Sequence, residues 1–100
     1  MSFLELKNTT LIHVPEQFKF FVCRGDRIDN IYDLVNCIEH LSPEQFHTHV
    51  NNEKNDFANW IRNVLQNGNL ANDLSIDENI VDRQHYLKTI KDHVAWLESL

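Results

Sequence analysis

The chain has 100 residues, of which 42% are hydrophobic and 24% charged, and its formal net charge is −6. This length suffices for one domain but not for two, and the composition is that of a folded chain. Binding to nucleic-acid phosphates needs a positive face, so the negative charge disfavours direct contact with nucleic acid. No apolar run approaches the roughly 20 residues that span a bilayer, and the first residues lack the pattern of a secretion signal. We therefore expect a single cytoplasmic domain, residues 1–100, without membrane contact.

The first part of the chain, residues 1–28, is predicted to be rich in extended structure. Within it, residues 2–14 combine apolar and β-branched residues with a turn-forming segment, and Pro15 disfavours helix in the residue before it. This pattern predicts two short strands. Two alternatives stay open for the same residues: a short helix over Phe3 to Lys7, and a loosely docked tail.

A clearer strand signal follows at residues 18–23, whose sequence is FKFFVC. Aromatic and β-branched residues favour strands, and residues 24–26, Arg-Gly-Asp, have the composition of a turn. Residues 27–28 can pair back to complete a small antiparallel hairpin. We expect this hairpin to pack on helices formed by residues 29–100.

Two helices are predicted in the middle of the chain. Apolar residues of the segment 30–41 recur every three or four positions, which places them on one face of a helix. They are Ile31, Leu34, Val35, Ile38 and Leu41. Ser42 is a preferred N-cap and Pro43 a preferred first helical residue, so a short helix is expected over residues 43–51.

The helix predicted over residues 56–67 is expected to be the packing centre of the domain. Its apolar residues, Phe57, Trp60, Ile61, Val64 and Leu65, fall on one face. Phe and Trp each bury on the order of 150–250 Å², so the two aromatic rings should point inward. Asn55 or Asp56 can cap the start of this helix, and Gly68 can take the left-handed conformation that ends it.

The longest helix is predicted over about residues 77–99. Asn69 can cap a single turn ahead of it, and Ser75 with Glu78 has the form of a capping box at its start. Its first apolar row is Ile76, Ile80, Arg83, Leu87, Ile90, Val94 and Leu97, with Arg83 as a polar interruption; a second row is Tyr86, Thr89, His93, Trp96 and Leu100. So wide an apolar arc needs cover from more than one layer. Either the core wraps around the helix or this edge contacts another protein. The candidate interface residues are then Tyr86, His93, Trp96 and Leu100.

The segment HVNNEKNDFANWI, residues 49–61, carries the most distinctive motif of the chain. With the Leu-Ala pair at residues 70–71, it resembles the signature of a family of short bacterial and archaeal domains of unknown function. The match covers roughly residues 18–75, and the residues that carry it are His49, Val50, Lys54, Asn55, Asp56, Phe57, Trp60 and Ile61. The resemblance implies a family, with these residues either structural or binding, but no activity.

The six histidines raise the question of a metal site. His47 and His49 lie two residues apart, which on a helix points them about 200° from each other, so one ion cannot easily bind both. A site formed by His47, His49 and Asp56 is the metal candidate, and His40 is an alternative neighbour for His49. The competing interpretation is that His49 donates a hydrogen bond that fixes the connection after its helix.

The sequence offers no catalytic signature. It contains no Gly-rich phosphate loop, no nucleophile elbow and no paired cysteine motif. Cys23 and Cys37 match no metal-ligand spacing, and in a reducing cytosol we expect free thiols rather than a disulfide between them. We therefore predict no enzymatic activity and no cofactor.

Together these features predict a mainly helical α+β domain, in which a small N-terminal antiparallel hairpin packs on four or five helices. The predicted function is a non-catalytic protein-binding or regulatory module, which could also self-associate as a homodimer through its C-terminal helix. The alternative is a small-molecule or metal-binding sensor domain that uses His47, His49 and Asp56. The sequence does not identify the protein partner.

Overall fold

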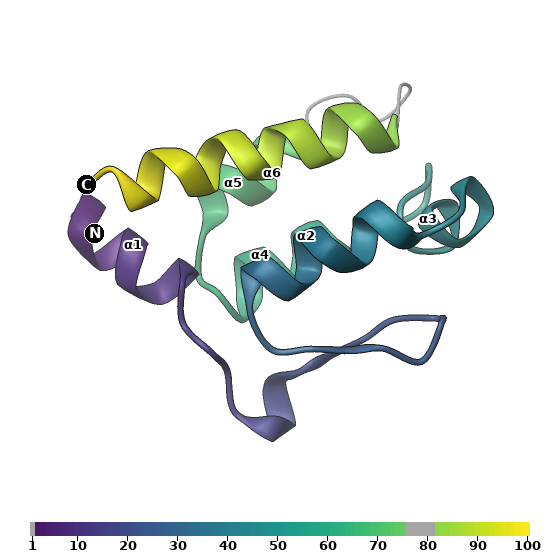
Figure 1. Cartoon of the computed structure of the whole chain (residues 1–100), viewed down its shortest axis with the longest axis horizontal. Coiled ribbons are helices and arrows are strands. Elements are labelled where there is room, and N and C mark those ends of the chain that lie inside the picture. Colours follow the sequence, from purple (N-terminus) through teal and green to yellow (C-terminus); the bar gives the residue numbers. More distant parts are fainter. Residues whose placement is uncertain (1, 76–81) are drawn as a thin grey trace.

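The computed structural model describes residues 2–75 and 82–100. It is a mainly helical α+β fold, in which a two-stranded antiparallel hairpin packs against helices (Figure 1). The elements in chain order are α1 (Phe3–Thr10), η1 (Glu16–Phe18), β1 (Phe20–Phe21), β2 (Arg27–Ile28), α2 (Ile31–His40), α3 (Pro43–His49), α4 (Asp56–Asn63), α5 (Gly68–Asp73) and α6 (Arg83–Glu98). The predicted fold class is confirmed, and the described residues contain one helix more than expected, at the N-terminus.

The prediction of two strands near the N-terminus is wrong, because α1 occupies this segment. Ser2 caps the helix by accepting a hydrogen bond from the Glu5 N–H at 3.1 Å. Leu6 and Thr10 lie one turn apart and are both buried, and the Thr10 hydroxyl donates to the Leu6 carbonyl at 2.7 Å. The cap and the buried face thus outweigh the β propensity of the threonine. The helical alternative for this segment is correct, and the helix extends beyond Lys7.

The predicted hairpin is confirmed, although its strands are shorter than residues 18–23. In β1 and β2, Phe20 lies opposite Ile28 and Phe21 opposite Arg27. The turn between them contains Gly25 at a φ of 100°, a backbone conformation that residues with a Cβ rarely adopt. The turn is thus compact enough for the hairpin to lie against α2.

The start of α3 follows the predicted capping signal, whereas the cap of α2 is Asn30, one residue after Asp29, which the sequence suggested. Asn30 caps α2 by accepting a hydrogen bond from the Asp33 N–H at 2.9 Å. Ser42 and Gln45 form a reciprocal capping box at the start of α3, with Pro43 in the first turn. Both helices end slightly earlier than predicted. After α3, Val50 pairs with Asn55 in an isolated antiparallel bridge that folds the connection to α4 back on itself.

The helix predicted over residues 56–67 is shorter in the structure, and the single turn predicted after it is the separate helix α5. Asn55 caps α4, as expected, but the helix ends at Asn63. The residue in the left-handed region is Gln66, with a φ of 56°, and not Gly68. The side chain of Asn67 then accepts the Leu70 N–H at 2.9 Å and caps α5, the function predicted for Asn69. Because Asn67 is fully buried and starts a new helix, it redirects the chain where the sequence suggested a simple helix end.

The last helix, α6, runs antiparallel to α2 and also contacts α1 and α5 (Figure 1). Its described part begins after Asp82, whose side chain caps it. The predicted start near residue 77, the capping box of Ser75 with Glu78, and the apolar residues Ile76 and Ile80 lie at least partly outside the described residues. No helix of the described ranges is both long and apolar enough to cross a lipid bilayer.

The hydrophobic core forms around α4, as predicted. Phe57 has no exposed surface and Trp60 only 6%, and the Trp60 indole N–H donates to the Phe18 carbonyl at 2.8 Å. The aromatic core residues around them are Phe20, Phe46 and Tyr86. The remaining buried apolar residues come from α2, α4, α5 and α6, from the hairpin and from the connecting segments, so one cluster joins the helices to the strands.

Candidate functional site

The polar connection between α3 and α4 holds a buried histidine, His49, with 6% of its surface exposed. Its Nδ1 lies 2.9 Å from Asp56 Oδ2, and its Nε2 accepts the backbone N–H of Cys23 at 2.9 Å. Because a backbone N–H can only donate, the ring is the neutral tautomer that carries its proton on Nδ1. His49 thus ties the end of the hairpin to the start of α4, which is the structural interpretation drawn from the sequence.

Asp56 is the charged member of this connection. Its partial burial would raise the pKa of its carboxyl group, but the hydrogen bonds from His49 and Lys54 outweigh that effect and hold the pKa below its usual value. The carboxylate is therefore ionised at neutral pH and completes the orientation of His49. Catalytic triads contain the same contact between an Asp carboxylate and a histidine. Whether His49 and Asp56 could form part of a triad therefore depends on where a nucleophilic side chain lies.

Cys23, whose backbone contacts His49, is not placed as the nucleophile of a triad. Its backbone N–H, and not its thiol, faces His49 Nε2, and its Sγ is 3.9 Å from the Gln45 carbonyl. The imidazole is thus already engaged at the atom that a general base would use. The other thiol, Cys37, is buried, and burial together with the Asp26 carboxylate raises its pKa to about 11. The two cysteines are free, as expected.

Two of the three predicted metal ligands, His49 and Asp56, contact each other, but His47 does not complete a three-ligand group with them. The His47 Nδ1 lies 3.2 Å from the Val50 carbonyl, and both ring nitrogens of His49 have protein partners. Over the ranges 2–75 and 82–100, no three His, Cys, Asp or Glu side chains form a group that could hold a metal ion. The geometry of the described residues therefore gives no support to a metal centre that includes Asp56.

The other residues of the central motif stabilise the fold. Val50, Phe57, Trp60 and Ile61 are buried. The Asn55 Oδ1 accepts the Ala58 N–H at 3.1 Å and the Tyr86 hydroxyl at 2.6 Å, and its Nδ2 donates to the Leu74 carbonyl. One amide side chain thus connects the start of α4 to α5 and α6.

The second row of α6 divides between core and surface. Tyr86 is buried, with its hydroxyl on Asn55, so it cannot form part of an exposed interface as predicted. His93 is half-buried, and its Nε2 accepts a hydrogen bond from Asn67 Nδ2 at 2.9 Å. Trp96 and Leu100 are the exposed members, with 38% and 44% of their surfaces accessible.

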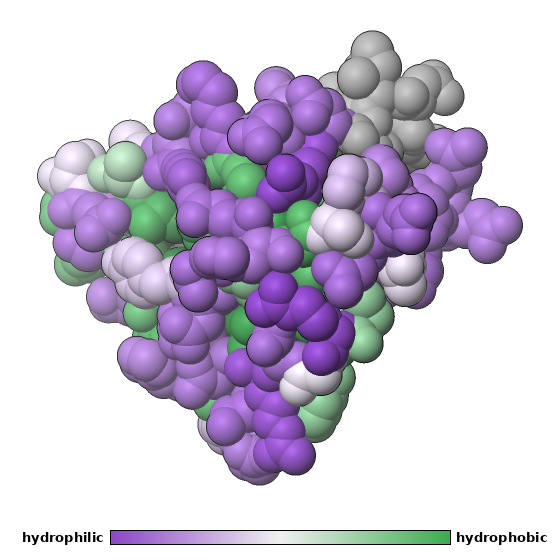
Figure 2. All heavy atoms as spheres, turned by 45° about the vertical axis from the view of Figure 1, so that its right-hand side comes forward, coloured by the Kyte–Doolittle hydropathy of each residue, from purple (hydrophilic) through white to green (hydrophobic). Residues whose placement is uncertain are grey.

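Two residues of α1 extend this exposed part into a larger surface. Phe3 and Leu4 are 62% and 61% exposed, and the Phe3 ring meets Trp96 edge-on with ring centroids 5.3 Å apart. We call Phe3, Leu4, Trp96 and Leu100 the terminal apolar surface, because it lies where both ends of the chain meet (Figure 1). In Figure 2 the visible face is mainly hydrophilic, and hydrophobic atoms appear in separate patches at its left edge, in its centre and at its lower right.

Phe3 and Leu4 were not among the predicted site residues. They were predicted to lie in a strand, whereas in the structure both belong to α1, which packs beside α6. A signal was present, since Ser2 followed by Glu5 three residues later is the pattern of a helix start. Nothing in the sequence, however, pairs Phe3 with Trp96, because they lie at opposite ends of the chain.

A hollow of about 210 Å³ adjoins the terminal apolar surface. Its lining is formed by Phe3, Leu6, Gln66, Gly68 and Asn69. It lies between α1 and the start of α5, and its lining contains no charged side chain.

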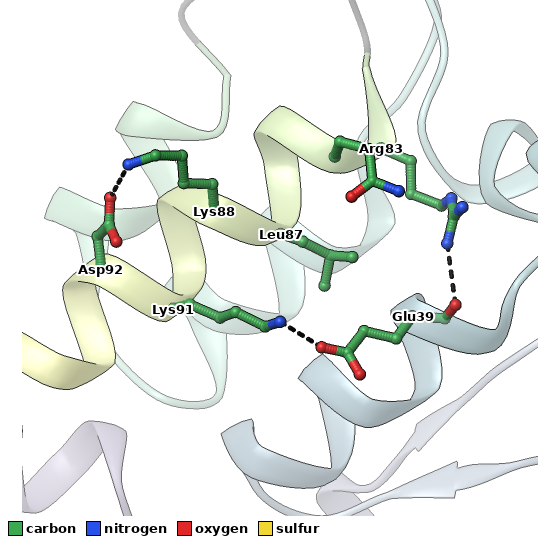
Figure 3. Close-up of a pocket in the computed structure, with 7 residues that line it drawn as sticks. Glu39, Arg83, Leu87, Lys88, Lys91 and Asp92 are labelled. Carbon is green, nitrogen blue, oxygen red and sulfur yellow. Dashed lines mark hydrogen bonds and ion pairs between the residues drawn. The ribbon is translucent and has the colours of Figure 1, made fainter.

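A second, larger cleft of about 440 Å³ lies between α2 and α6 (Figure 3). Two of its three cations are paired with carboxylates: Lys91 pairs with Glu39, and Lys88 with Asp92 at 2.7 Å. Arg83 donates to the Glu39 carbonyl at 2.9 Å. The partner of Arg83 is a neutral carbonyl, so the lining residues carry one positive charge more than negative charges, and the ion pairs of Lys88 and Lys91 occupy both carboxylates.

Comparisons of the chain with protein-family models, with curated proteins and with solved structures found no match. The resemblance of the central motif to a family of unknown function stays a prediction.

Proposed function

We propose that this protein is a non-catalytic protein-binding module, which binds a segment of a partner protein at its terminal apolar surface. The observation that carries the proposal is the exposed Phe3–Trp96 pair at the junction of α1 and α6. Aromatic residues, and Trp above all, contribute a large share of the binding energy at protein interfaces. Adjacent exposed apolar side chains are also a feature of such interfaces.

The environment of His49 supports a role without catalysis. A general base needs a free nitrogen facing its substrate or nucleophile, whereas both nitrogens of His49 bind protein atoms. The hydrogen bonds of His49 explain why a polar motif lies beside the hydrophobic core: they hold the α3–α4 connection in place. The connection between α3 and α4 is then a structural element of the module, and the cytoplasm, where free thiols persist, is its proposed location.

The charges around the surface favour a basic partner segment. Three carboxylates, those of Glu5, Asp73 and Glu98, belong to α1, α5 and the last turn of α6. The one ammonium group of these elements is that of Lys7, which already donates to the Leu100 carbonyl at 3.0 Å. A segment with apolar and basic residues would complement both the apolar centre and its acidic surroundings.

Selection from a phage-displayed library of random peptides tests the proposal. Binders to the wild-type protein should combine apolar with Lys or Arg residues, and Trp96→Ser should weaken them about tenfold or more, as loss of a central aromatic does. Phe21→Ser is the control, because Phe21 is also an exposed aromatic residue, with 62% of its surface accessible, but belongs to the hairpin. Failure to select any binder, or binders that are insensitive to Trp96→Ser, would contradict the proposal.

Self-association is the other outcome of this experiment. If the protein dimerises through the same residues, light scattering will give twice the monomer mass, and Trp96→Asp will restore the monomer. That result would replace the basic partner segment by a second copy of this chain. It would keep the terminal apolar surface as the binding site.

A further inference from the structure

We infer that the hollow between α1 and α5 receives one large apolar side chain of the bound segment. This inference rests on the proposed function, because the hollow shares Phe3 with the terminal apolar surface. Interfaces of this kind concentrate their binding energy in a few side chains that enter pockets of the partner. The hollow thus provides the anchor position, and the exposed aromatic pair provides the contact beside it.

The backbone between α4 and α5 creates the hollow. Gln66 in the left-handed region turns the chain away from α4, and Gly68 begins α5 without a side chain. A Cβ built on Gly68 would meet no atom within 4 Å, so the space above it is open. Leu6, only 5% exposed, provides an apolar contact beneath this space.

The size of the hollow points to a single side chain. Its volume of about 210 Å³ is below the roughly 300–1,000 Å³ of pockets that enclose small-molecule ligands or cofactors. A leucine, methionine or phenylalanine side chain matches a space of this scale better than a larger ligand does. The hollow is therefore assigned to a protein segment, in agreement with the surface beside it.

The chemistry of the lining specifies the kind of side chain. Phe3 and Leu6 provide apolar contact, and burying an apolar group against them is favourable by roughly 25 cal/mol per Å². A charged group in the same place would lose its hydration without gaining an opposite charge, because the lining has none. The amides of Gln66 and Asn69 can bind the backbone of the segment that carries the anchor.

Filling the hollow tests the inference without disturbing the surface beside it. Gly68→Leu adds a side chain where the structure has open space, and Gly68 has no positive φ that would make the substitution strained. Peptides selected on the wild-type protein should bind Gly68→Leu about tenfold more weakly or worse. Asn52→Leu is the control, because it adds the same side chain at an exposed position of the α3–α4 connection and should leave affinity within about twofold.

Alanine substitution along the selected peptide identifies the anchor. At one apolar position of the peptide, alanine substitution should weaken binding to the wild-type protein. The same substitution should hardly change binding to Gly68→Leu, because the blocked hollow holds neither the original side chain nor alanine. If Gly68→Leu does not keep the wild-type circular dichroism spectrum, Asn69→Phe blocks the rim of the hollow instead. Additive losses in both proteins would overturn the inference.

The two proposals fail in different ways. Peptide binding that is weakened by Trp96→Ser but unchanged by Gly68→Leu and Asn69→Phe would remove the anchor and keep the protein-binding surface. Binding unchanged by all three substitutions would remove both. We expect that Trp96→Ser and the substitutions that block the hollow each weaken peptide binding.

Discussion

At the residue scale, two histidines connect elements that are distant in the sequence. His49 joins the hairpin to α4, and His93 joins α6 to the buried Asn67. Asn67 in turn donates to the Thr10 hydroxyl at 3.0 Å and thereby reaches α1. Each imidazole accepts a hydrogen bond through Nε2, so each contributes to the fold in its neutral form.

Removal of the His49 ring should destabilise the fold. His49→Ala removes the imidazole hydrogen bonds to the Cys23 N–H and to the Asp56 carboxylate, each of which contributes about 0.5–1.5 kcal/mol. Urea denaturation of wild-type and variant proteins measures the difference. His85→Ala is the control, because His85 is exposed on α6 and its loss should change stability by less than about 0.5 kcal/mol. Equal stability of the two variants would show that the His49 contacts contribute nothing.

His93 should make the stability depend on pH. Its burial lowers the pKa of its imidazole below 6.5, although the nearby Asp73 carboxylate opposes the shift. The unfolded chain therefore binds the proton more readily, and the stabilising contribution is present above about pH 6.5 and lost as the pH falls through the folded-state pKa. Between about pH 7.5 and about pH 5.5, the urea midpoint of unfolding should decrease more for the wild type than for His93→Gln, whose side chain does not titrate. An equal decrease in both proteins would contradict this role of His93.

At the scale of elements, the predicted helices follow local signals that the structure uses. Ser42 and Pro43 start α3, and the spacing of apolar residues places Phe57 and Trp60 in the core. Such signals act within a few residues, so the sequence alone reveals them. The hairpin was predictable for the same reason, because a turn with Gly25 follows an aromatic run.

The elements that were not predicted depend on distant contacts. The α4–α5 break needs the buried Asn67, which is held by Thr10 and His93 from two other helices. Neither partner is a sequence neighbour, so Asn67 looked like the end of one helix. The terminal apolar surface was found only in part for the same reason, since Trp96 was predicted but its partner Phe3 was not.

The packing of α4 gives a prediction at this scale. Trp60→Ala should cost about 3–5 kcal/mol, because it leaves a cavity in the core and removes the hydrogen bond to Phe18. That is a large part of the roughly 5–15 kcal/mol that stabilise a typical domain. Trp96→Ala is the matched control. Trp96 is partly exposed, so this substitution should lower the free energy of unfolding by about 1 kcal/mol, near the value of the aromatic pair with Phe3. Thermal and urea unfolding of both variants measure the difference, and a larger loss for Trp96→Ala would contradict the assigned core.

At the scale of the whole molecule, net charge sets how the protein meets other proteins. A charge of −6 on 100 residues makes two copies of this chain repel each other and attracts a basic partner. Part of this charge comes from Glu5, Asp73 and Glu98, which belong to α1, α5 and α6, the helices around the proposed binding site. Both effects are screened over a Debye length of about 10 Å at 0.1 M salt.

Salt should therefore act in opposite directions on the two modes of association. Affinity for a selected basic peptide should fall as salt is raised from about 0.05 to 0.5 M, because screening removes the attraction. Any self-association through Trp96 should instead become stronger over the same range, since screening removes repulsion between acidic copies and leaves the apolar contact. Isothermal titration with the peptide and light scattering of the protein alone measure the two trends, with Trp96→Asp as the control for both. Peptide affinity that is independent of salt would show that charge does not select the partner, and the terminal apolar surface would then bind through apolar contact alone.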